Sequence, residues 1–206
     1  NNLKASLSNL WRGPESLLEA LRKFEFLLNT SSKSLKQKFQ KNYDLHRIKK
    51  KLHLVNTAKE DLTELLKNKS EVFTGLFVVK VKKMQDFMLL KADKLLKLLK
   101  ELVVSHLDSS ITDLEQLNTE INNTLKHQPS NLEELHEIKT FIQSHLSDKV
   151  QLIKEESARV FENISVLEEF KHEVDLELHL RAWLCFAFPK EILQIRKKCL
   201  STIFKY

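Results

Sequence analysis

The chain has 206 residues, of which 42% are hydrophobic and 30% are charged, and its formal net charge is +6 at pH 7. Two glycines and three prolines are too few for a domain rich in hairpins, because tight turns depend on residues with special backbone angles. Leu, Lys and Glu, which dominate the composition, are strong helix formers. We therefore predict an all-α fold, an elongated helical bundle with coiled-coil-like helix pairs.

The charge is distributed unevenly along the chain. Residues 1–107 contain 22 basic and 11 acidic residues, residues 108–179 contain 6 and 16, and residues 180–206 contain 6 and 1. Oppositely charged segments can dock on each other or on separate partners. We divide the chain into a basic helical segment, residues 1–125, and a second helical segment, residues 126–206.

Cysteine content and hydropathy favour a cytoplasmic location. Cys185 and Cys199 are the only cysteines and do not form a disulfide framework, which fits a reducing compartment. The longest apolar run is much shorter than the roughly 20 residues of a membrane helix. Because the chain begins without Met, we expect it to be a piece of a longer polypeptide.

The first predicted elements are a helix, a turn and a basic segment. Gly13 breaks what precedes it, and Pro14 suits the first position of a helix. Residues 29–34 predict a turn with capping residues, followed by a basic amphipathic segment over residues 35–54. We weigh this segment as a docking face for an acidic partner against a solvated basic face. The basic residues between positions 33 and 51 form the proposed docking face and are Lys33, Lys36, Lys38, Lys41, Arg47, Lys49, Lys50 and Lys51.

Residues 58–107 are predicted to form one long helix, which starts at a capping box from Thr57 to Glu60. Residues 72–81 are rich in β-branched side chains, which favour a strand, but we predict helix there because no partner strand is evident. The last part has a wide apolar stripe, typical of a core helix. A calmodulin-type target and a membrane-surface helix are the alternatives for residues 82–107. The stripe comprises Met88, Ala92, Leu95, Leu96, Leu98, Leu99, Leu102 and Val103.

Residues 108–113 are predicted to cap a further helix that ends near Leu125. Pro129 then marks a boundary, and Ser130 with Glu133 predicts a second capping box for a helix that runs to about Glu173. Upstream of its heptad seam, one extra four-residue step predicts a stutter. The seam, either a coiled coil or one face of a bundle, consists of Leu146, Val150, Ile153, Ser157, Val160, Ile164 and Leu167.

Motifs for catalysis or cofactor binding are absent from the sequence. It contains no P-loop and no H-E-x-x-H motif. His172 and His179, with Asp175 between them, form a weak candidate for a metal site, which we weigh against solvated histidines. Cys185 lies in an apolar cluster, where a thiol stays protonated, so we interpret it as structural. We predict a segment without enzyme activity, cofactor or metal.

The densest aromatic cluster surrounds Pro189. The sequence predicts that one helix ends near Phe170 and that an acidic connection follows. A short helix should then present Leu180, Trp183, Leu184 and Phe186 on its apolar side, and Pro189 should end it and start the next helix. We interpret this corner as a rigid joint. Its residues are Leu167, Phe170, Trp183, Phe186, Phe188, Pro189 and Ile192.

This pattern resembles the stem of dynein heavy chains, in particular the axonemal type. The family's stem has a helix that ends like "LEEF", an acidic connection, an aromatic segment, and then an aromatic–Pro pair that opens a helix. Residues 167–170, Trp183, Phe186 and residues 188–192 match it, as does the helix start at residues 128–135. The family usually has Trp before the proline, and here Phe188 keeps an aromatic there. The match covers residues 126–200.

The resemblance implies a mechanical role just before the linker of a microtubule motor, whose AAA+ modules lie elsewhere in the parent chain. The expected partners are other dynein heavy, intermediate or light chains and axonemal docking or regulatory complexes. Neither nucleic acid nor membrane is expected as a partner, and the expected location is the cytoskeleton of the ciliary axoneme. The alternative is a free-standing helical tether or scaffold of the spectrin or exocyst kind.

Overall fold

The computed structural model describes residues 14–67, 71–74 and 77–203. Most of these residues are helical, and the only strands within the described ranges form one small hairpin, which confirms the predicted all-α class. The chain divides into two compact units, Asn1–Leu102 and Val103–Tyr206. The division falls inside one helix, whereas the sequence placed a segment boundary at residue 125.

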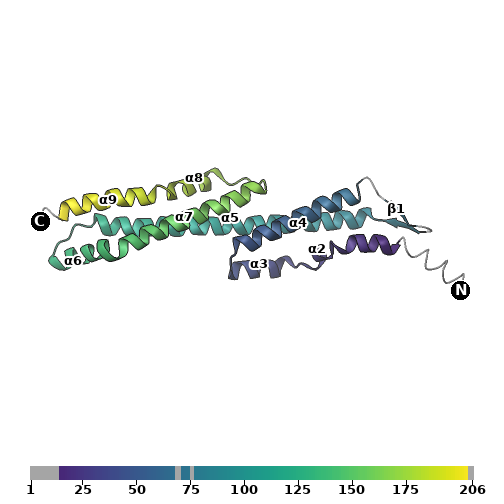
Figure 1. The fold of residues 1–206 in the computed structure, drawn as a ribbon, viewed down its shortest axis with the longest axis horizontal. Helices are drawn as coiled ribbons and strands as arrows, with labels where there is room; N and C mark the ends of the chain where they lie inside the picture. The colour runs from purple at the N-terminus through teal and green to yellow at the C-terminus, as the bar shows by residue number, and fades with distance from the viewer. Residues whose placement is uncertain (1–13, 68–70, 75–76, 204–206) are drawn as a thin grey trace. The chain divides into compact units, whose positions relative to one another are not determined.

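The first unit contains short helices followed by a long one (Figure 1). Ser31 caps α3 by accepting a hydrogen bond from the Ser34 amide, so the predicted turn is present. The helical elements of the first unit are residues 14–22, α2 (Glu25–Asn29), α3 (Ser32–Lys41), α4 (Leu45–Leu65) and the first part of α5 (Lys82–Lys126).

The predicted helix start at Thr57 is wrong, because Thr57 lies in the middle of α4. The helix begins at Asp44, whose carboxylate accepts a hydrogen bond of 3.0 Å from the Arg47 amide. A carboxylate at this position satisfies an amide that has no partner within the helix. The buried side chains of α4 continue without a break past Thr57, so no new helix is needed there. They are Ile48, Leu52, Val55, Ala58 and Leu62.

The helix predicted over residues 72–81 is also wrong, since a β-hairpin interrupts the chain there. Strand β1 (Glu71–Thr74) pairs antiparallel with β2 (Phe77–Lys80), and Val72 lies opposite Val79. Only two residues separate the paired Thr74 and Phe77. The partner strand that was not evident from the sequence is therefore the second half of the same β-branched stretch. β-branched residues fit the pleated backbone of such a pair better than a helix.

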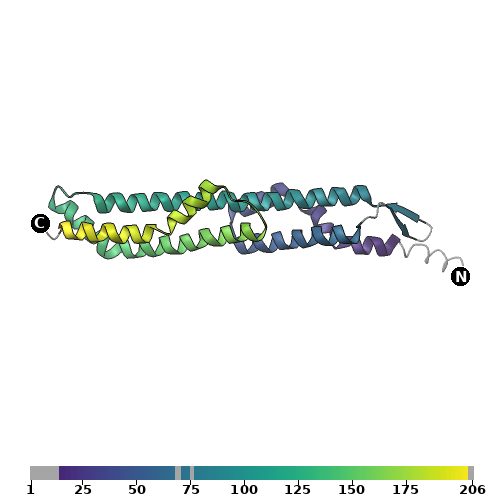
Figure 2. The same cartoon turned by 90° about the horizontal axis from the view of Figure 1, so that it is seen from above.

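The apolar stripe of α5 is core, as predicted. Ala92, Leu95 and Leu99 are fully buried, and Met88 is nearly so. The helix lies beside α4 in both views (Figures 1 and 2), and Lys59 on α4 forms a 2.7 Å ion pair with Asp93 on α5. A buried stripe is not available to a calmodulin-type protein or a membrane surface, so neither alternative for this helix is supported.

The second unit is built from the end of α5 and three further helical stretches, which lie side by side in both views (Figures 1 and 2). The predicted new helix at residues 108–113 is wrong, because α5 continues to Lys126. The Thr112 hydroxyl donates a hydrogen bond to the Asp108 carbonyl one turn earlier. Because this bond satisfies the hydroxyl, the helix can continue through Thr112. The first of the three stretches is continuous and comprises α6 (Leu132–Thr140), η1 (Phe141–His145) and α7 (Leu146–Glu169). The other two stretches are α8 (Leu176–Cys185) and α9 (Phe188–Ile203).

The capping box of α6 lies one residue later than predicted. Asn131, not Ser130, accepts a hydrogen bond from the Glu134 amide at 2.8 Å. The Glu134 carboxylate reaches back to the Ser130 amide at 2.7 Å, and hydrogen bonds from the amide and hydroxyl of Ser130, together with one from His127, hold the pKa of Glu134 below its usual value. Asn at the cap is as effective as Ser, and Glu134 rather than Glu133 provides the reciprocal carboxylate, which binds the amide of the residue before the cap.

All the predicted seam residues of α7 are buried, which confirms the face assigned to them. Ile138, Ile142, Leu146 and Val150 are also buried, although they follow one another at intervals of four. The π-helical turn η1 lies between α6 and α7 and absorbs the extra residue. The predicted stutter is therefore a π-bulge, which returns the apolar stripe to the core.

Candidate functional site: the corner between α7, α8 and α9

The chain reverses at the corner that the sequence interpreted as a joint. Helix α7 ends at Glu169, near the predicted Phe170 but before the predicted Glu173. Lys171 adopts a left-handed φ of 50°, and the His172 amide donates to the Leu167 carbonyl at 2.9 Å. The Lys171 amide donates to the Glu168 carbonyl, which completes a Schellman motif. This motif directs the chain out of α7 toward α8.

Helix α8 presents a different face to the interior from the one predicted. Leu178, Ala182 and Cys185 are buried, whereas the side chains expected on its apolar side are exposed. Trp183 is 56% exposed and Phe186 is 46% exposed. Leu178, Ala182 and Cys185 follow at spacings of four and three, so a stripe with two small residues permits close helix packing. The burial of Trp183 and Phe186 that the joint implied is therefore wrong.

The other joint residues are arranged as a packed corner. Leu167 and Ile192 are fully buried, and Phe188 is nearly so. Phe170 and Pro189 are half-buried. Pro189 is the second residue of α9, where its missing amide hydrogen costs the helix nothing. The predicted helix start is therefore one residue too late, because Phe188 is the first residue of α9, and α8 already ends at Cys185 rather than at the proline.

Trp183 and Phe186 instead form a half-exposed aromatic cluster with Phe161 of α7. The Phe161 ring centroid lies 4.9 Å from that of Trp183 in an edge-to-face arrangement, and 4.2 Å from that of Phe186. The Trp183 indole donates a 2.9 Å hydrogen bond to the His179 ring. These contacts fix the orientation of Trp183 while leaving much of its surface open.

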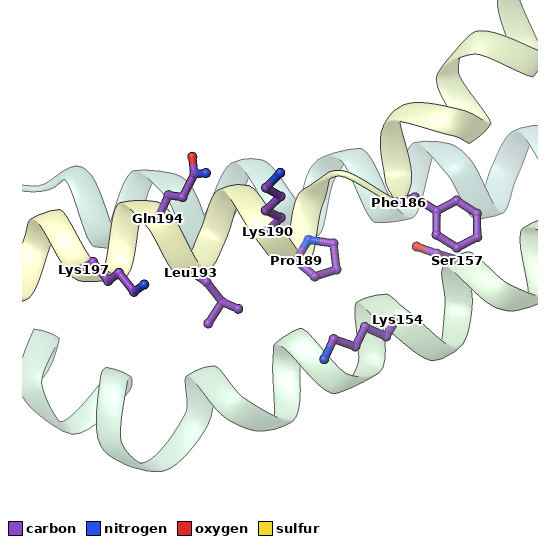
Figure 3. A pocket seen from close by; sticks show the side chains of 8 residues that line it. All are labelled: Lys154, Ser157, Phe186, Pro189, Lys190, Leu193, Gln194 and Lys197. Carbon is purple, nitrogen blue, oxygen red and sulfur yellow. The ribbon is translucent and has the colours of Figure 1, made fainter.

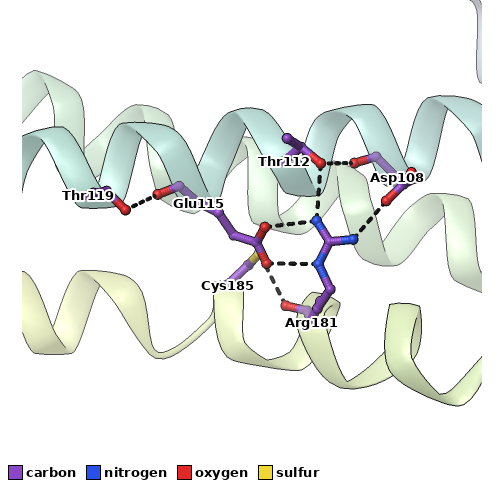
Figure 4. Close-up of polar contacts among 6 residues, drawn as sticks. All are labelled: Asp108, Thr112, Glu115, Thr119, Arg181 and Cys185. Carbon is purple, nitrogen blue, oxygen red and sulfur yellow. Dashed lines mark hydrogen bonds and ion pairs between the residues drawn. The ribbon is translucent and has the colours of Figure 1, made fainter.

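Arg181 fastens α8 to α5 (Figure 4). Its guanidinium donates two hydrogen bonds to the Glu115 carboxylate at 2.9 and 2.8 Å, one to Asp108 at 2.8 Å and one to the Thr112 hydroxyl at 3.0 Å. The hydrogen bonds to Glu115 are the main reason that the pKa of Arg181 is raised. The sequence does not reveal the partner of this cluster, although Asp108, Thr112 and Glu115 share one helix face at spacings of four and three.

One buried hydrogen bond joins α7 to α8, and a second lies within α8 beside it. The Ser157 hydroxyl, in the seam of α7, donates to the Cys185 carbonyl at 3.3 Å. The Cys185 thiol donates to the Arg181 carbonyl, and burial raises the pKa of this thiol to about 11. A protonated, buried thiol is not a nucleophile, so the structure agrees with a structural Cys185.

A groove with a volume of about 540 Å³ lies between α7 and α9, next to the Phe186 and Pro189 side chains of the corner (Figure 3). Leu193 and Pro189 point from α9 toward α7, whereas the Lys154 side chain extends along α7 (Figure 3). Sequence analysis did not identify it, since the lining comes from two helices. Its lining residues are Lys154, Ser157, Phe186, Pro189, Lys190, Leu193, Gln194 and Lys197.

The candidate metal site is not formed in the described part of the chain. No group of three or more His, Cys, Asp or Glu side chains within residues 14–67, 71–74 and 77–203 is arranged to hold a metal. His179 is instead the acceptor for Trp183. Over the same residues, none of the helices combines the length and the apolar character that crossing a bilayer requires.

The predicted basic docking face lies on α3 and α4 of the first unit. Six of its eight side chains are exposed, and Lys49 and Lys51 are half-buried. Arg47 forms a 2.9 Å ion pair with Asp44, and the Lys51 ammonium lies over the Phe26 ring at 5.4 Å. The face is accessible, and its role in docking stays a prediction.

No protein-family model matches the chain, and no curated protein matches it significantly.

Proposed function

We propose that this chain is a non-catalytic stem segment of an axonemal dynein heavy chain, the subunit of a microtubule motor. In this role it links the cargo-bound tail to the motor ring and transmits force between them. The observation that carries the proposal is the corner between α7 and α9, where a helix end, an acidic connection, a short helix and an aromatic–Pro pair follow in the order typical of that stem.

A lever requires a corner that does not bend freely under load. Three independent contacts support this property here: the Arg181–Glu115 pair between α8 and α5, the Ser157–Cys185 bond between α7 and α8, and the burial of Ile192 at the start of α9. The 24 residues of α7 form a helix about 36 Å long that leads into the corner. Packed helices with fixed ends are stiff, because protein interiors are densely packed.

The proposal also covers partners and location. The exposed lysines of α3 and α4 are suited to acidic surfaces of neighbouring heavy, intermediate or light chains, or of axonemal docking complexes. The location that follows is the ciliary axoneme. In this proposal neither nucleic acid nor membrane is a partner.

Sequencing the parent transcript beyond the codon for Tyr206 tests the proposal. We expect an open reading frame that continues into a linker and then into several modules with the G-x-x-x-x-G-K-[ST] motif, because a dynein heavy chain hydrolyses ATP there. A reading frame that ends soon after this segment without such modules would contradict the dynein assignment. The chain would then be better described as a free-standing helical tether.

A further inference from the structure

We propose that the groove between α7 and α9 is the docking site for an amphipathic α-helix of a partner protein, one that carries acidic residues beside its apolar stripe. This inference concerns a surface of the second unit and does not depend on the dynein assignment. It is distinct from the basic face on α3 and α4.

The floor of the groove is apolar although it is open to solvent. Leu193 is 42% exposed, and Phe186 and Pro189 form the neighbouring wall. Phe186 is also in contact with Phe161, which in turn contacts Trp183, so the apolar surface continues from the groove onto α8. An exposed apolar surface rimmed by polar residues is typical of an interaction site.

The rim of the groove carries charge of one sign. Lys154, Lys190 and Lys197 line it, and no acidic residue does. Among the residues that the structure describes, none forms an ion pair with any of these three lysines. Their charges are therefore available to carboxylates of a partner, and complementary charges at a rim direct association and set register.

The shape of the surface favours a helix over a small anionic molecule. A second hollow of about 650 Å³ adjoins the groove and shares Lys154 and Leu193 with it. The two hollows follow α7 and α9 from Phe186 to Ile142, and they are open along their length (Figure 3 shows the first). The surface that lines the first hollow is mainly apolar, and polar side chains dominate the lining of the second. An open groove of this kind accepts the i, i+3, i+4 and i+7 side chains of a helix on its apolar part and polar side chains of the same helix farther along.

The second hollow also sets a limit on the partner's charge. Asp148 and Arg196 both line it, so that end carries mixed charge. We therefore expect the acidic residues of the partner to lie beside the first groove, whose charged lining residues are all lysines. Trp183, beside the first groove, has the exposed aromatic surface that often dominates binding energy at interfaces.

The test uses the 206-residue chain and a fluorescein-labelled helical peptide that has Leu at i, i+3, i+4 and i+7 and Glu on both flanks. Fluorescence anisotropy at physiological salt should show saturable binding. A peptide of the same composition with the stripe scrambled, and a peptide with Lys in place of Glu, should bind at least about tenfold more weakly. Equal binding of all three peptides, or no saturable binding, would overturn the proposal.

Matched substitutions locate the binding. The triple change Lys154→Glu, Lys190→Glu and Lys197→Glu should weaken the acidic peptide at least about tenfold. The control Lys83→Glu, Lys94→Glu and Lys139→Glu changes the net charge equally at exposed lysines that do not line either hollow and should leave affinity within about twofold. Leu193→Ala should weaken binding, whereas Leu152→Ala, at a similarly exposed leucine of α7 outside the groove, should not. Equal effects in the two sets would refute the location.

An anionic lipid surface is the competing occupant, and one further arm distinguishes it. The same variants are sedimented with phosphatidylcholine–phosphatidylserine vesicles. The helix proposal expects no difference between the groove triple variant and its control, and no displacement of the peptide by vesicles. Vesicle binding that is lost only in the groove variant, with no binding of the peptide, would overturn the helix in favour of a membrane. Circular dichroism establishes that each variant is folded.

Discussion

Arg181 on α8 and Glu115 on α5 face each other with both ends of the guanidinium fork engaged, Nε to Oε1 at 2.9 Å and Nη2 to Oε2 at 2.8 Å. The residues are 66 positions apart in the chain. This planar, bidentate geometry is one that Arg forms and Lys cannot. Since Asp108 and Thr112 accept hydrogen bonds from two of the three remaining N–H groups, the guanidinium fixes the angle at which α8 leaves the corner.

The coupling energy between Arg181 and Glu115 should be larger than that of an ordinary surface ion pair. In a double-mutant cycle of Arg181→Ala and Glu115→Ala, we expect a coupling energy of about 1 kcal/mol, because the pair is bidentate and only partly exposed. The exposed i,i+4 pair Lys82–Asp86 is the control and should give about 0.3–0.5 kcal/mol. Urea unfolding followed by Trp183 fluorescence in a Trp11→Phe background measures both. A coupling for Arg181 no larger than the control would contradict the fastening role.

The corner should depend on its buried aliphatic residue more than on its tryptophan. Ile192 is fully buried, so Ile192→Ala should lower the free energy of unfolding by about 2–5 kcal/mol. Trp183 is more than half exposed, and Trp183→Ala should cost only about 0.5–1.5 kcal/mol through the lost aromatic pair with Phe161. Thermal unfolding followed by circular dichroism measures both changes. A larger loss for Trp183→Ala would mean that the aromatic cluster is the structural centre of the joint.

The fold was predictable from the sequence wherever the pattern of apolar residues or capping residues was strong. The seam of α7 was predictable, because a long run of apolar residues at spacings of four and three has only one buried face. Runs of capping residues predicted that a helix starts nearby, as at residues 29–34 and 130–133, but they did not identify the capping residue, which is Ser31 in the first run and Asn131 in the second. At Thr57 and residues 108–113, tertiary burial on both sides carried the helix through residues that often start one.

The site was less predictable than the fold, for two physical reasons. On α8, hydrophobicity pointed to Trp183, but the small residue Ala182 and the thiol of Cys185 permit the closer approach of the neighbouring helices, so they are buried. The Arg181 cluster joins residues far apart in the chain, and a sequence does not record such pairing. The groove has the same origin, because its lysines come from two helices that only the fold brings together.

Lys171 offers a position where a small change should stabilise the protein. A non-glycine residue with φ of 50° costs about 1–2 kcal/mol, and the Schellman motif after α7 holds Lys171 there. We expect Lys171→Gly to raise the free energy of unfolding by up to about 1 kcal/mol, since glycine's greater freedom in the unfolded state offsets part of the gain. Lys171→Ala, which removes the same side chain but keeps the Cβ, is the control. An equal gain from Ala in urea unfolding would assign the effect to charge instead.

The buried thiols should make stability fall in alkaline solution. The pKa of Cys185 is raised from 9.0 to about 11 by burial, and the pKa of Cys199 is raised for the same reason. The folded state therefore binds the proton more tightly, so this contribution is complete below about pH 9 and is lost as the pH rises toward 11. In Cys185→Ala, the decline in free energy of unfolding between these values should be shallower than in the wild type. Parallel pH profiles for the two proteins would show that Cys185 titrates normally.

If the chain serves as a lever, loosening the corner should separate movement from ATP hydrolysis. Arg181→Glu in the full-length heavy chain places a carboxylate against Asp108 and Glu115, and the repulsion should detach α8 from α5. We expect microtubule gliding to slow severalfold while the ATPase rate of the motor stays unchanged, because no ATP-binding motif lies in this segment. Arg159→Glu, at an exposed arginine of α7, is the matched control and should leave gliding unchanged. A parallel fall of gliding and ATPase in the Arg181 variant would argue against a mechanical role for the corner.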